Sequence, residues 1–190
     1  MRKICLFLAL LLSNSLLAND VWYASSVKNL FENSKSTTIK GRLLPTSKIE
    51  VLGEVDGRYK IKISGFVKEG TEHAIYFAQK NRILVAGLSK GSNFEVLSST
   101  NIDKSDFKEI SVVAFVEKDS LTKDLNSLYV QADELYKNNC GICHSAHNIK
   151  EFTANLWPSV MKSMLSRTAL TKEDNYLVVQ YLQKHAKDME

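Results

Sequence analysis

The apolar and polar positions between about residues 39 and 116 follow the pattern of a β-rich region. Single apolar residues alternate with polar ones, and this period of two is typical of half-buried strands. Asp56-Gly57 lies between two such stretches and predicts a tight hairpin turn. The polar pair Lys80-Asn81 separates two further apolar stretches in the same way. The four clearest strands are predicted at residues 49–51, 59–63, 75–78 and 83–86.

A short sequence pattern occurs twice in this region, first over residues 51–67 and again over residues 96–116. Each copy begins with valine-leucine, continues through an aromatic residue followed by lysine and a run of strand residues, and ends with phenylalanine-valine. The pattern resembles bacterial SH3-like modules, which are small β-barrels. It therefore predicts either two small barrels or one barrel with a long hairpin extension.

From about residue 120 onward the apolar spacing changes to the period of amphipathic helices. The first helix is predicted to run from about Leu125 directly into Cys140. A second helix is predicted over residues 155–167. A third begins at Thr171, where an aspartate three residues later completes a capping-box pattern. The C-terminal part is therefore predicted to hold three helices.

Residues 1–18 have the pattern of an export signal. Two basic residues, Arg2 and Lys3, precede a short apolar run that ends near small residues. Cleavage is expected after Ala18, with Ser15 as the alternative site, and an uncleaved membrane anchor is the alternative outcome. The sequence thus predicts a periplasmic protein. Loss of both basic residues would lower the formal net charge from +4 to +2, a mild value that gives no indication of nucleic-acid binding.

The most informative motif is Cys-x-x-Cys-His at residues 140–144. Its spacing is that of a c-type haem attachment site, in which two cysteines form thioether bonds and the adjacent histidine binds the iron. The sequence therefore predicts one covalent haem c, held by Cys140 and Cys143, with His144 as the proximal ligand. A thioredoxin-type redox pair would need a βαβ pattern, and a zinc site would need a second cysteine pair. The third cysteine, Cys5, lies in the export signal.

A low-spin haem iron also needs a distal ligand, and the chain offers four main candidates. His147 is only three residues from the proximal histidine, so its tether disfavours the opposite face of the ring. His185 is more consistent with the end of the last helix, near free carbonyl groups. Met161 and Met164 lie on the apolar stripe of the second helix, and spacing alone does not separate them as ligands.

Together these patterns predict an α+β fold with N-terminal SH3-like β-barrel domain(s) followed by a small three-helix cytochrome c haem domain. The expected division is a signal peptide over residues 1–18, an SH3-like β domain over 19–119 and a monohaem cytochrome c domain over 120–190. A domain as short as the last one has a small apolar core, so the haem would supply much of its buried surface.

Most of the chain resembles the TorC-type cytochromes c that serve bacterial trimethylamine N-oxide reductases. The β region and the first helix take part, and the clearest matches surround the haem motif: residues 140–144, His147, residues 154–157, Met164 and residues 181–188. Other monohaem domains have a ligating methionine seven residues after a tryptophan, and Trp157 and Met164 have this spacing. The resemblance therefore implies Met164 as the distal ligand, with Met161 as the second choice.

The resemblance also implies a function. TorC-type proteins carry four further haems in an N-terminal membrane-anchored segment that oxidises quinol, whereas this chain has one Cys-x-x-Cys-His motif. We therefore expect a periplasmic single-electron carrier, not an enzyme, that donates electrons to a molybdopterin N-oxide or S-oxide reductase. Its own donor is expected to be an upstream membrane quinol-oxidising complex or another cytochrome. The alternatives are a haem-based sensor and an assembly factor for the reductase.

Overall fold

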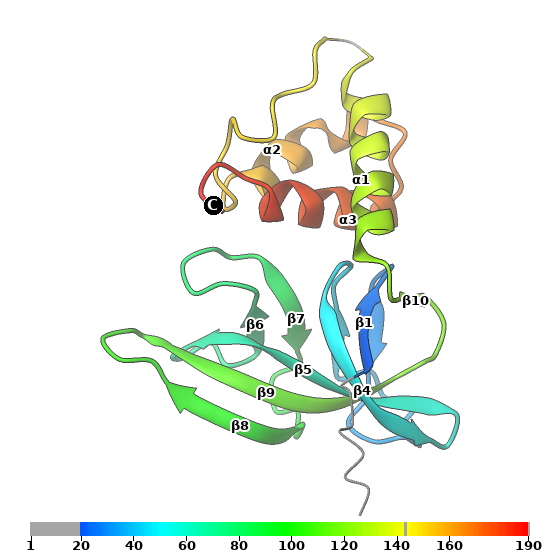
Figure 1. The fold of residues 1–190 in the computed structure, drawn as a ribbon, viewed down its shortest axis with the longest axis vertical. Coiled ribbons are helices and arrows are strands. Elements are labelled where there is room, and N and C mark those ends of the chain that lie inside the picture. The colour runs from blue at the N-terminus through cyan, green and yellow to red at the C-terminus, as the bar shows by residue number, and fades with distance from the viewer. Residues whose placement is uncertain (1–19, 143, 190) are drawn as a thin grey trace, which may run out of the picture.

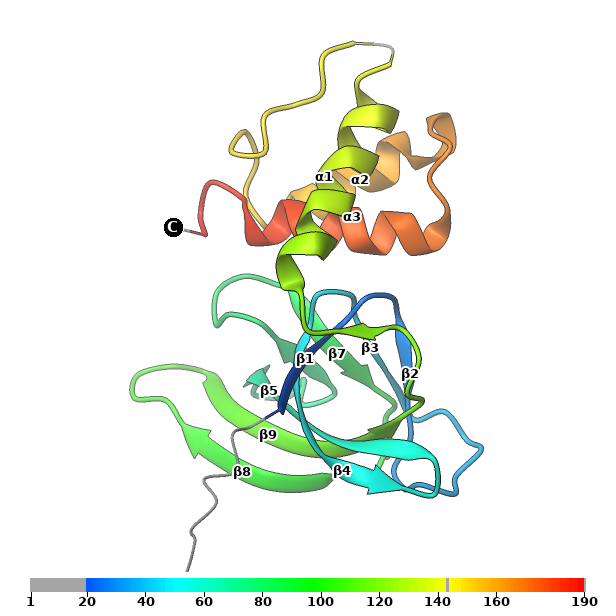
Figure 2. The ribbon, with the colours of Figure 1, turned by 45° about the vertical axis from the view of Figure 1, so that its right-hand side comes forward.

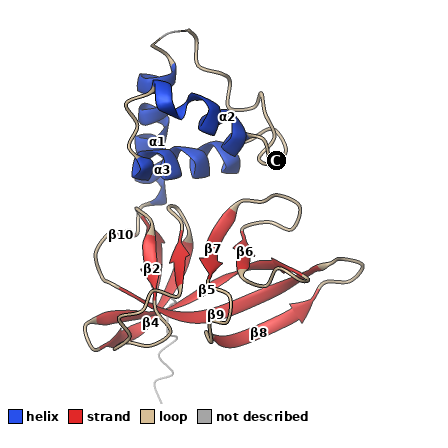
Figure 3. Cartoon of the chain, turned by 180° about the vertical axis from the view of Figure 1, so that it is seen from behind, coloured by secondary structure: helices blue, strands red, loops and turns tan. Residues whose placement is uncertain are grey.

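A computed structural model describes residues 20–142 and 144–189 of the chain. Figure 1 shows a large β part, coloured mainly blue to green, with three helices packed at one end of it. Figure 3 shows the same arrangement from behind, with the helices above the ends of the strands. Within the described residues, no helix has both the length and the apolar character that crossing a membrane requires. The predicted signal peptide, residues 1–18, lies outside the described residues.

The β part is an antiparallel sheet of ten strands in the described residues. The strands are β1 (Asp20–Ala24), β2 (Lys28–Leu30), β3 (Gly41–Leu43), β4 (Lys48–Val55), β5 (Arg58–Lys68), β6 (Ala74–Tyr76), β7 (Leu84–Leu88), β8 (Glu95–Asn101), β9 (Phe107–Val116) and β10 (Leu121–Thr122). Hydrogen-bonded neighbours follow the order β10-β1-β4-β5-β6-β7-β3-β2, and β9 pairs with both β5 and β8. The predicted strand pairs on either side of Asp56-Gly57 and Lys80-Asn81 are confirmed as β4-β5 and β6-β7.

The long pair of β5 and β9 forms the centre of the sheet. Its register runs without interruption from Tyr59 opposite Val116 to Lys68 opposite Phe107. Alternate apolar side chains of these two strands belong to the core of the sheet, because successive residues of a strand face opposite sides of the sheet. The residues that this pair contributes to the core are Ile61, Ile63, Val67, Ile110, Val112, Ala114 and Val116.

The sheet curls back on itself, and Figure 2 shows its curvature. Phe31, just after β2, forms an isolated bridge with Phe115 of β9 through backbone hydrogen bonds of 3.0 and 2.9 Å. Strands β5 and β6 approach each other closely at Gly65, where a Cβ atom would lie 2.5 Å from the carbonyl oxygen of Tyr76. Glycine is therefore required at this position of the sheet.

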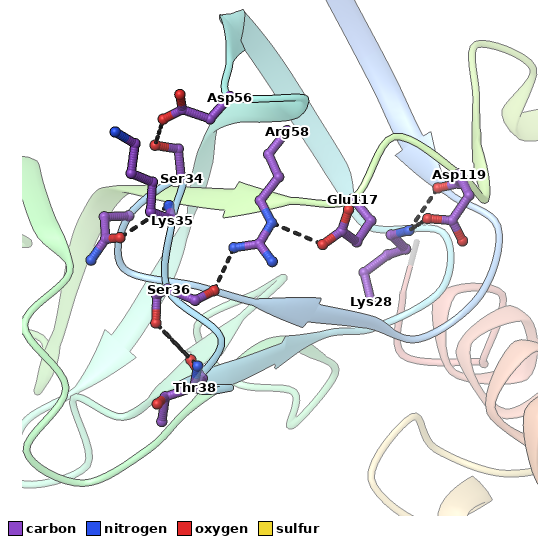
Figure 4. Close-up of polar contacts among 10 residues, drawn as sticks. Lys28, Ser34, Lys35, Ser36, Thr38, Asp56, Arg58, Glu117 and Asp119 are labelled. Carbon is purple, nitrogen blue, oxygen red and sulfur yellow. Dashed lines mark hydrogen bonds and ion pairs between the residues drawn. The ribbon is translucent and has the colours of Figure 1, made fainter.

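Charged side chains hold the loops at one end of the curved sheet, as Figure 4 shows. The Arg58 guanidinium donates to the Ser36 carbonyl at 2.6 Å and to the Glu117 carboxylate at 2.8 Å. Lys28 is only 4% exposed, and its ammonium donates to the Asp119 carboxylate at 2.6 Å. This hydrogen bond lowers the pKa of Asp119. Arg58 and Lys28 are thus each matched by a carboxylate, which offsets the cost of burying their charge.

Three α-helices and one short 3₁₀ helix follow the sheet. They are α1 (Leu125–Cys140), α2 (Trp157–Met164), η1 (Leu165–Arg167) and α3 (Lys172–Lys184). Asp124 caps α1 by accepting a hydrogen bond of 3.0 Å from the backbone N–H of Ser127. The capping box predicted at Thr171 and Asp174 is confirmed at the start of α3. Local sequence signals therefore place the first turns of α1 and α3.

The helices share a second core, distinct from the core of the sheet. Most of its members come from the helices and the segments between them. Ile83 precedes β7 in the β region, yet it is 0% exposed and belongs to the core of the helices. One side chain of the β region thus helps to fill the helical core.

Buried side chains of α3 also join the helices to the loops of the sheet. Gln183 Nε2 donates to the Ala154 carbonyl at 2.8 Å and to the Arg82 carbonyl at 3.4 Å. Gln180 Nε2 donates to the Leu84 carbonyl at 2.9 Å. Separation of the helices from the sheet would leave the Arg82 and Leu84 carbonyl groups without their amide partners, and a lost hydrogen bond between buried groups is costly.

The predicted fold, SH3-like β-barrel domain(s) followed by a small three-helix cytochrome c haem domain, is wrong. The chain is mostly β, the core of the helices includes Ile83 of the β region, and Gln180 of α3 donates to the Leu84 carbonyl of β7. The two copies of the repeat form the hairpins β4-β5 and β8-β9, and β5 pairs with β9. Both copies therefore belong to one sheet. A division into residues 19–119 and 120–190 stays a prediction.

Lys184, the last residue of α3, lies at the junction of the helices and the sheet. Its ammonium donates to the carbonyl and the hydroxyl oxygen of Thr46, at 2.9 and 2.8 Å, in the turn between β3 and β4. The nitrogen also lies 4.8 Å from the ring centroid of Phe77. Burial lowers the pKa of Lys184 to about 8. The folded protein therefore releases this proton more readily than the unfolded chain does.

Lys184 is expected to make the free energy of unfolding rise with pH between about 8 and 10.5. In this range the unfolded chain binds the proton and the folded protein does not, so raising the pH removes a cost of folding. Relative to Lys184→Met, the wild type should gain about 1 to 2 kcal/mol between pH 8 and pH 10. Urea unfolding at several pH values, followed by circular dichroism, measures this difference. Lys172→Met removes an exposed lysine of the same helix and serves as control. If the stability difference between the wild type and Lys184→Met did not change with pH, the lowered pKa of Lys184 would be contradicted.

Candidate haem site

The first residue of the haem motif, Cys140, is the last residue of α1. The helix ends at Gly141, whose backbone N–H donates to the Lys137 carbonyl at 3.0 Å. A Cβ atom at position 141 would lie 2.7 Å from that same carbonyl oxygen, so a side chain would disturb this turn. Burial raises the pKa of the Cys140 thiol. The second predicted thioether residue, Cys143, lies outside the described residues.

A cavity of about 190 Å³ lies between the end of α1, the segment after it, α2 and η1. It brings together the predicted thioether residue Cys140, the predicted proximal ligand His144 and both candidate methionines, Met161 and Met164. The lining residues are Tyr136, Asn139, Cys140, His144, Ala146, His147, Trp157, Val160, Met161, Met164, Arg167 and Thr168. The structure therefore gathers in one place the described residues that the sequence assigns to haem.

The His144 ring is held in the tautomer that can bind iron. Its Nδ1 atom lies 2.9 Å from the carbonyl oxygen of Ser145. A carbonyl oxygen only accepts hydrogen bonds, so Nδ1 is the donor, and in the neutral ring Nε2 then keeps its lone pair. Metal-binding histidines commonly use this arrangement, in which the second nitrogen donates to a backbone carbonyl. This contact supports His144 as an iron ligand.

The two candidate methionines differ in their surroundings. Met161 is 2% exposed and belongs to the core of the helices. Met164, at the end of α2, is partly exposed and is not a member of that core. Both side chains line the cavity, but only Met161 also packs deeply among the helices. The prediction that Met164 is the distal ligand, with Met161 as second choice, stays a prediction.

The two other candidate histidines lie in different places. His147 lines the cavity, and its Nδ1 lies 3.0 Å from the Glu151 carboxylate. His185 ends α3 as expected, with Nδ1 2.8 Å from the Tyr181 carbonyl. Its ring packs against Tyr129 and Tyr181, at centroid distances of 4.7 and 4.6 Å. His185 is not among the residues that line the cavity.

An aromatic wall closes one side of the cavity. Trp157 is 0% exposed, and its indole N–H donates to the Ile149 carbonyl at 3.2 Å. The rings of Tyr136 and Phe152 contact the Trp157 ring edge to face, at centroid distances of 6.0 and 5.0 Å. Burial, with smaller effects from Cys140 and Glu151, raises the pKa of Tyr136 to about 12. The wall is therefore apolar and uncharged at neutral pH, which suits the face of a porphyrin.

Sequence reasoning did not find every residue that lines the cavity. Arg167 and Thr168 line the cavity, although neither was selected from the sequence. They continue the helical spacing of Val160, Met161 and Met164, three and four residues further along. The periodicity thus contained a signal for them, but a charged and a polar residue are not expected on an apolar stripe.

Comparisons with known proteins relate the chain to cytochrome c-type proteins. The family model described as "TorC third cytochrome c domain" matches residues 17–121. The chain is 33% identical over 166 residues to the cytochrome c-type protein TorY of Haemophilus influenzae, which covers 83% of this chain and 45% of that protein. It is 26% identical over 176 residues to the cytochrome c-type protein TorC of Escherichia coli strain K12, with coverage of 90% and 45%. The chain thus spans less than half the length of these curated relatives.

No solved structure gives a significant match to the chain. The family match covers more than half of the sequence, including almost all of the described sheet, and it ends before α1 and the haem motif. The alignments to the relatives cover more of the chain, up to 90% of it. The chain therefore belongs to the family of the TorC third cytochrome c domain.

Proposed function

We propose that this protein is a periplasmic monohaem cytochrome c that passes single electrons to a molybdopterin N-oxide or S-oxide reductase. Membership of a cytochrome c family implies covalently bound haem c. The observation that carries the proposal is the cavity that joins Cys140, His144 and Met164. Trimethylamine N-oxide reductase is the type of partner that the resemblance to TorC-type cytochromes implies. The proposed donor is an upstream membrane quinol-oxidising complex or another cytochrome.

The residues of the cavity fit the needs of a haem. Cys140 and Cys143 would hold the porphyrin, His144 would bind the iron through Nε2, and a bound haem would supply reversible one-electron chemistry. Trp157 and Tyr136 cover one side of the cavity and would shield a bound haem from water on that side. Burial of the haem is one of the properties that set its reduction potential. The proposed role is that of an electron carrier rather than of a catalyst.

A deletion experiment tests the electron-carrier role. Cells without the gene are expected to lose most reduction of N-oxides or S-oxides in respiration, because electrons no longer reach the reductase. Reductase activity measured with an artificial dye donor should survive, since the dye replaces the carrier. Expression of the wild-type gene should restore respiration, and expression of the His144→Ala variant should not.

Other results would change the proposal in specific ways. Loss of the dye-linked activity would show that the protein is needed to assemble the reductase. Unchanged reduction by whole cells would show that the proposed partner is wrong. A five-coordinate, high-spin spectrum of the purified protein would favour a haem-based sensor.

A further inference from the structure

The polar groups of the cavity wall are mostly occupied by partners within the protein. Four side chains that line the cavity each use a donor group in a hydrogen bond to a backbone carbonyl of the protein. These bonds run from Tyr136 to His147 at 2.9 Å, from Asn139 to Leu135 at 2.9 Å, from Trp157 to Ile149 at 3.2 Å and from Thr168 to Leu165 at 2.9 Å.

Arg167 is the exception among the residues that line the cavity. It is the last residue of η1, its side chain is exposed, and it lines the cavity. Within residues 20–142 and 144–189, no hydrogen bond or ion pair engages its guanidinium, in contrast to Arg58. Among the described lining residues it is also the only side chain with a permanent charge.

A haem brings two carboxylates into such a site. The porphyrin carries its two propionates on the pyrrole rings that do not carry the vinyl groups, so thioether bonds hold one edge and leave the propionate edge unanchored. An arginine presents a planar pair of N–H donors that matches a carboxylate with two parallel hydrogen bonds. Partial removal from water strengthens this pairing.

We propose that the Arg167 guanidinium binds a propionate of the haem and fixes the edge of the ring opposite the thioether bonds. This inference rests on the proposed haem-binding function. Arg167 is then a binding and positioning residue that also raises the reduction potential, because a nearby cation favours the ferrous state over the more positive ferric state. A solvated surface arginine with no role in the site would have neither effect.

Three variants of the haem-loaded protein test the inference. Arg167→Gln removes the charge, Arg167→Lys keeps the charge without the planar pair of donors, and Lys162→Gln removes an exposed cation of α2 that does not line the cavity. At a fixed ambient potential, Arg167→Gln should lower the ratio of ferrous to ferric protein about tenfold, which is about 59 mV for one electron. Arg167→Lys should recover part of this loss, and Lys162→Gln should change the ratio less than twofold.

Resonance Raman spectroscopy gives a second readout, because the propionate bending modes report hydrogen bonds to these groups. They should shift in Arg167→Gln and stay unchanged in Lys162→Gln. Equal potential shifts in the two glutamine variants would overturn the inference, as they would show only a general effect of charge. An unchanged potential and an unchanged propionate mode in Arg167→Gln would overturn it as well. Absence of covalent haem from the wild type would instead refute the proposed function.

Discussion

Replacing both motif cysteines, Cys140→Ala with Cys143→Ala, is expected to abolish covalent haem attachment. Thioether bonds to the two vinyl groups need both sulfur atoms, and after signal removal the chain would hold no other cysteine. The wild-type protein should exceed the mass of its polypeptide by one haem and should give a haem-stained band on a denaturing gel. The double variant should show neither signal.

The same variant is expected to lose stability in the helices. Without the haem, Tyr136, Trp157 and Met161 would border a cavity of about 190 Å³. A cavity of that volume costs up to roughly 4.5 kcal/mol at about 24 cal/mol per Å³, if it neither collapses nor fills with water. Unfolding by urea, followed by circular dichroism, should therefore begin at a lower concentration than in the haem-loaded wild type.

A matched control separates loss of haem from a general effect of substitution on α1. Val130→Ala changes an exposed side chain of the same helix that does not line the cavity, and it should retain the haem and most of the stability. Covalent attachment would be refuted if the wild-type protein released its haem on denaturation. Retention of full helical stability by the haem-free variant would show that the haem is not a major part of this core.

Met164→Ala is expected to convert a low-spin iron to a high-spin iron and to lower the reduction potential. The reason is that a ligating methionine stabilises the ferrous state, and its removal leaves the distal position open. Because Met164 is partly exposed and lies outside the helical core, this change should cost little stability. Absorption and electron paramagnetic resonance spectra, together with a redox titration, measure the outcome.

Met161→Ala is the matched comparison and should show the opposite pattern. Met161 is 2% exposed within the core, so its truncation is expected to cost about 2 to 5 kcal/mol while the spectrum stays low-spin. The reverse result, with a high-spin Met161→Ala and a low-spin Met164→Ala protein, would assign the ligand to Met161. A bis-histidine spectrum of the wild type would reject both methionines and favour His147, which lines the cavity, over His185, which does not.

The candidate haem site was visible in the sequence because its signals are local. The Cys-x-x-Cys-His motif occupies five consecutive positions, and the helix that ends at Cys140 follows from apolar residues spaced three and four apart. The structure adds that Met161 and Met164 reach the same cavity as His144. It also adds Arg167, which periodicity alone does not separate from a solvated charge at the end of a helix.

The sequence by itself determined the local elements: the turn at Asp56-Gly57, the capping box at Thr171 and the positions of the three helices. Each depends on residues only a few positions apart, so the chemistry that forms it is readable from neighbours in the chain.

Only the tertiary structure decided how these elements combine. Strands β5 and β9 pair although a long stretch of chain separates them, and this pairing merges the two hairpins that resemble separate modules into one sheet. The alternation of apolar and polar residues within a hairpin specifies which of its faces is buried, but not which other strand pairs with its outer edge. The apolar side chain of Ile83 suits the core of the sheet as well as that of the helices. Only the packing of the folded chain places it in the core of the helices.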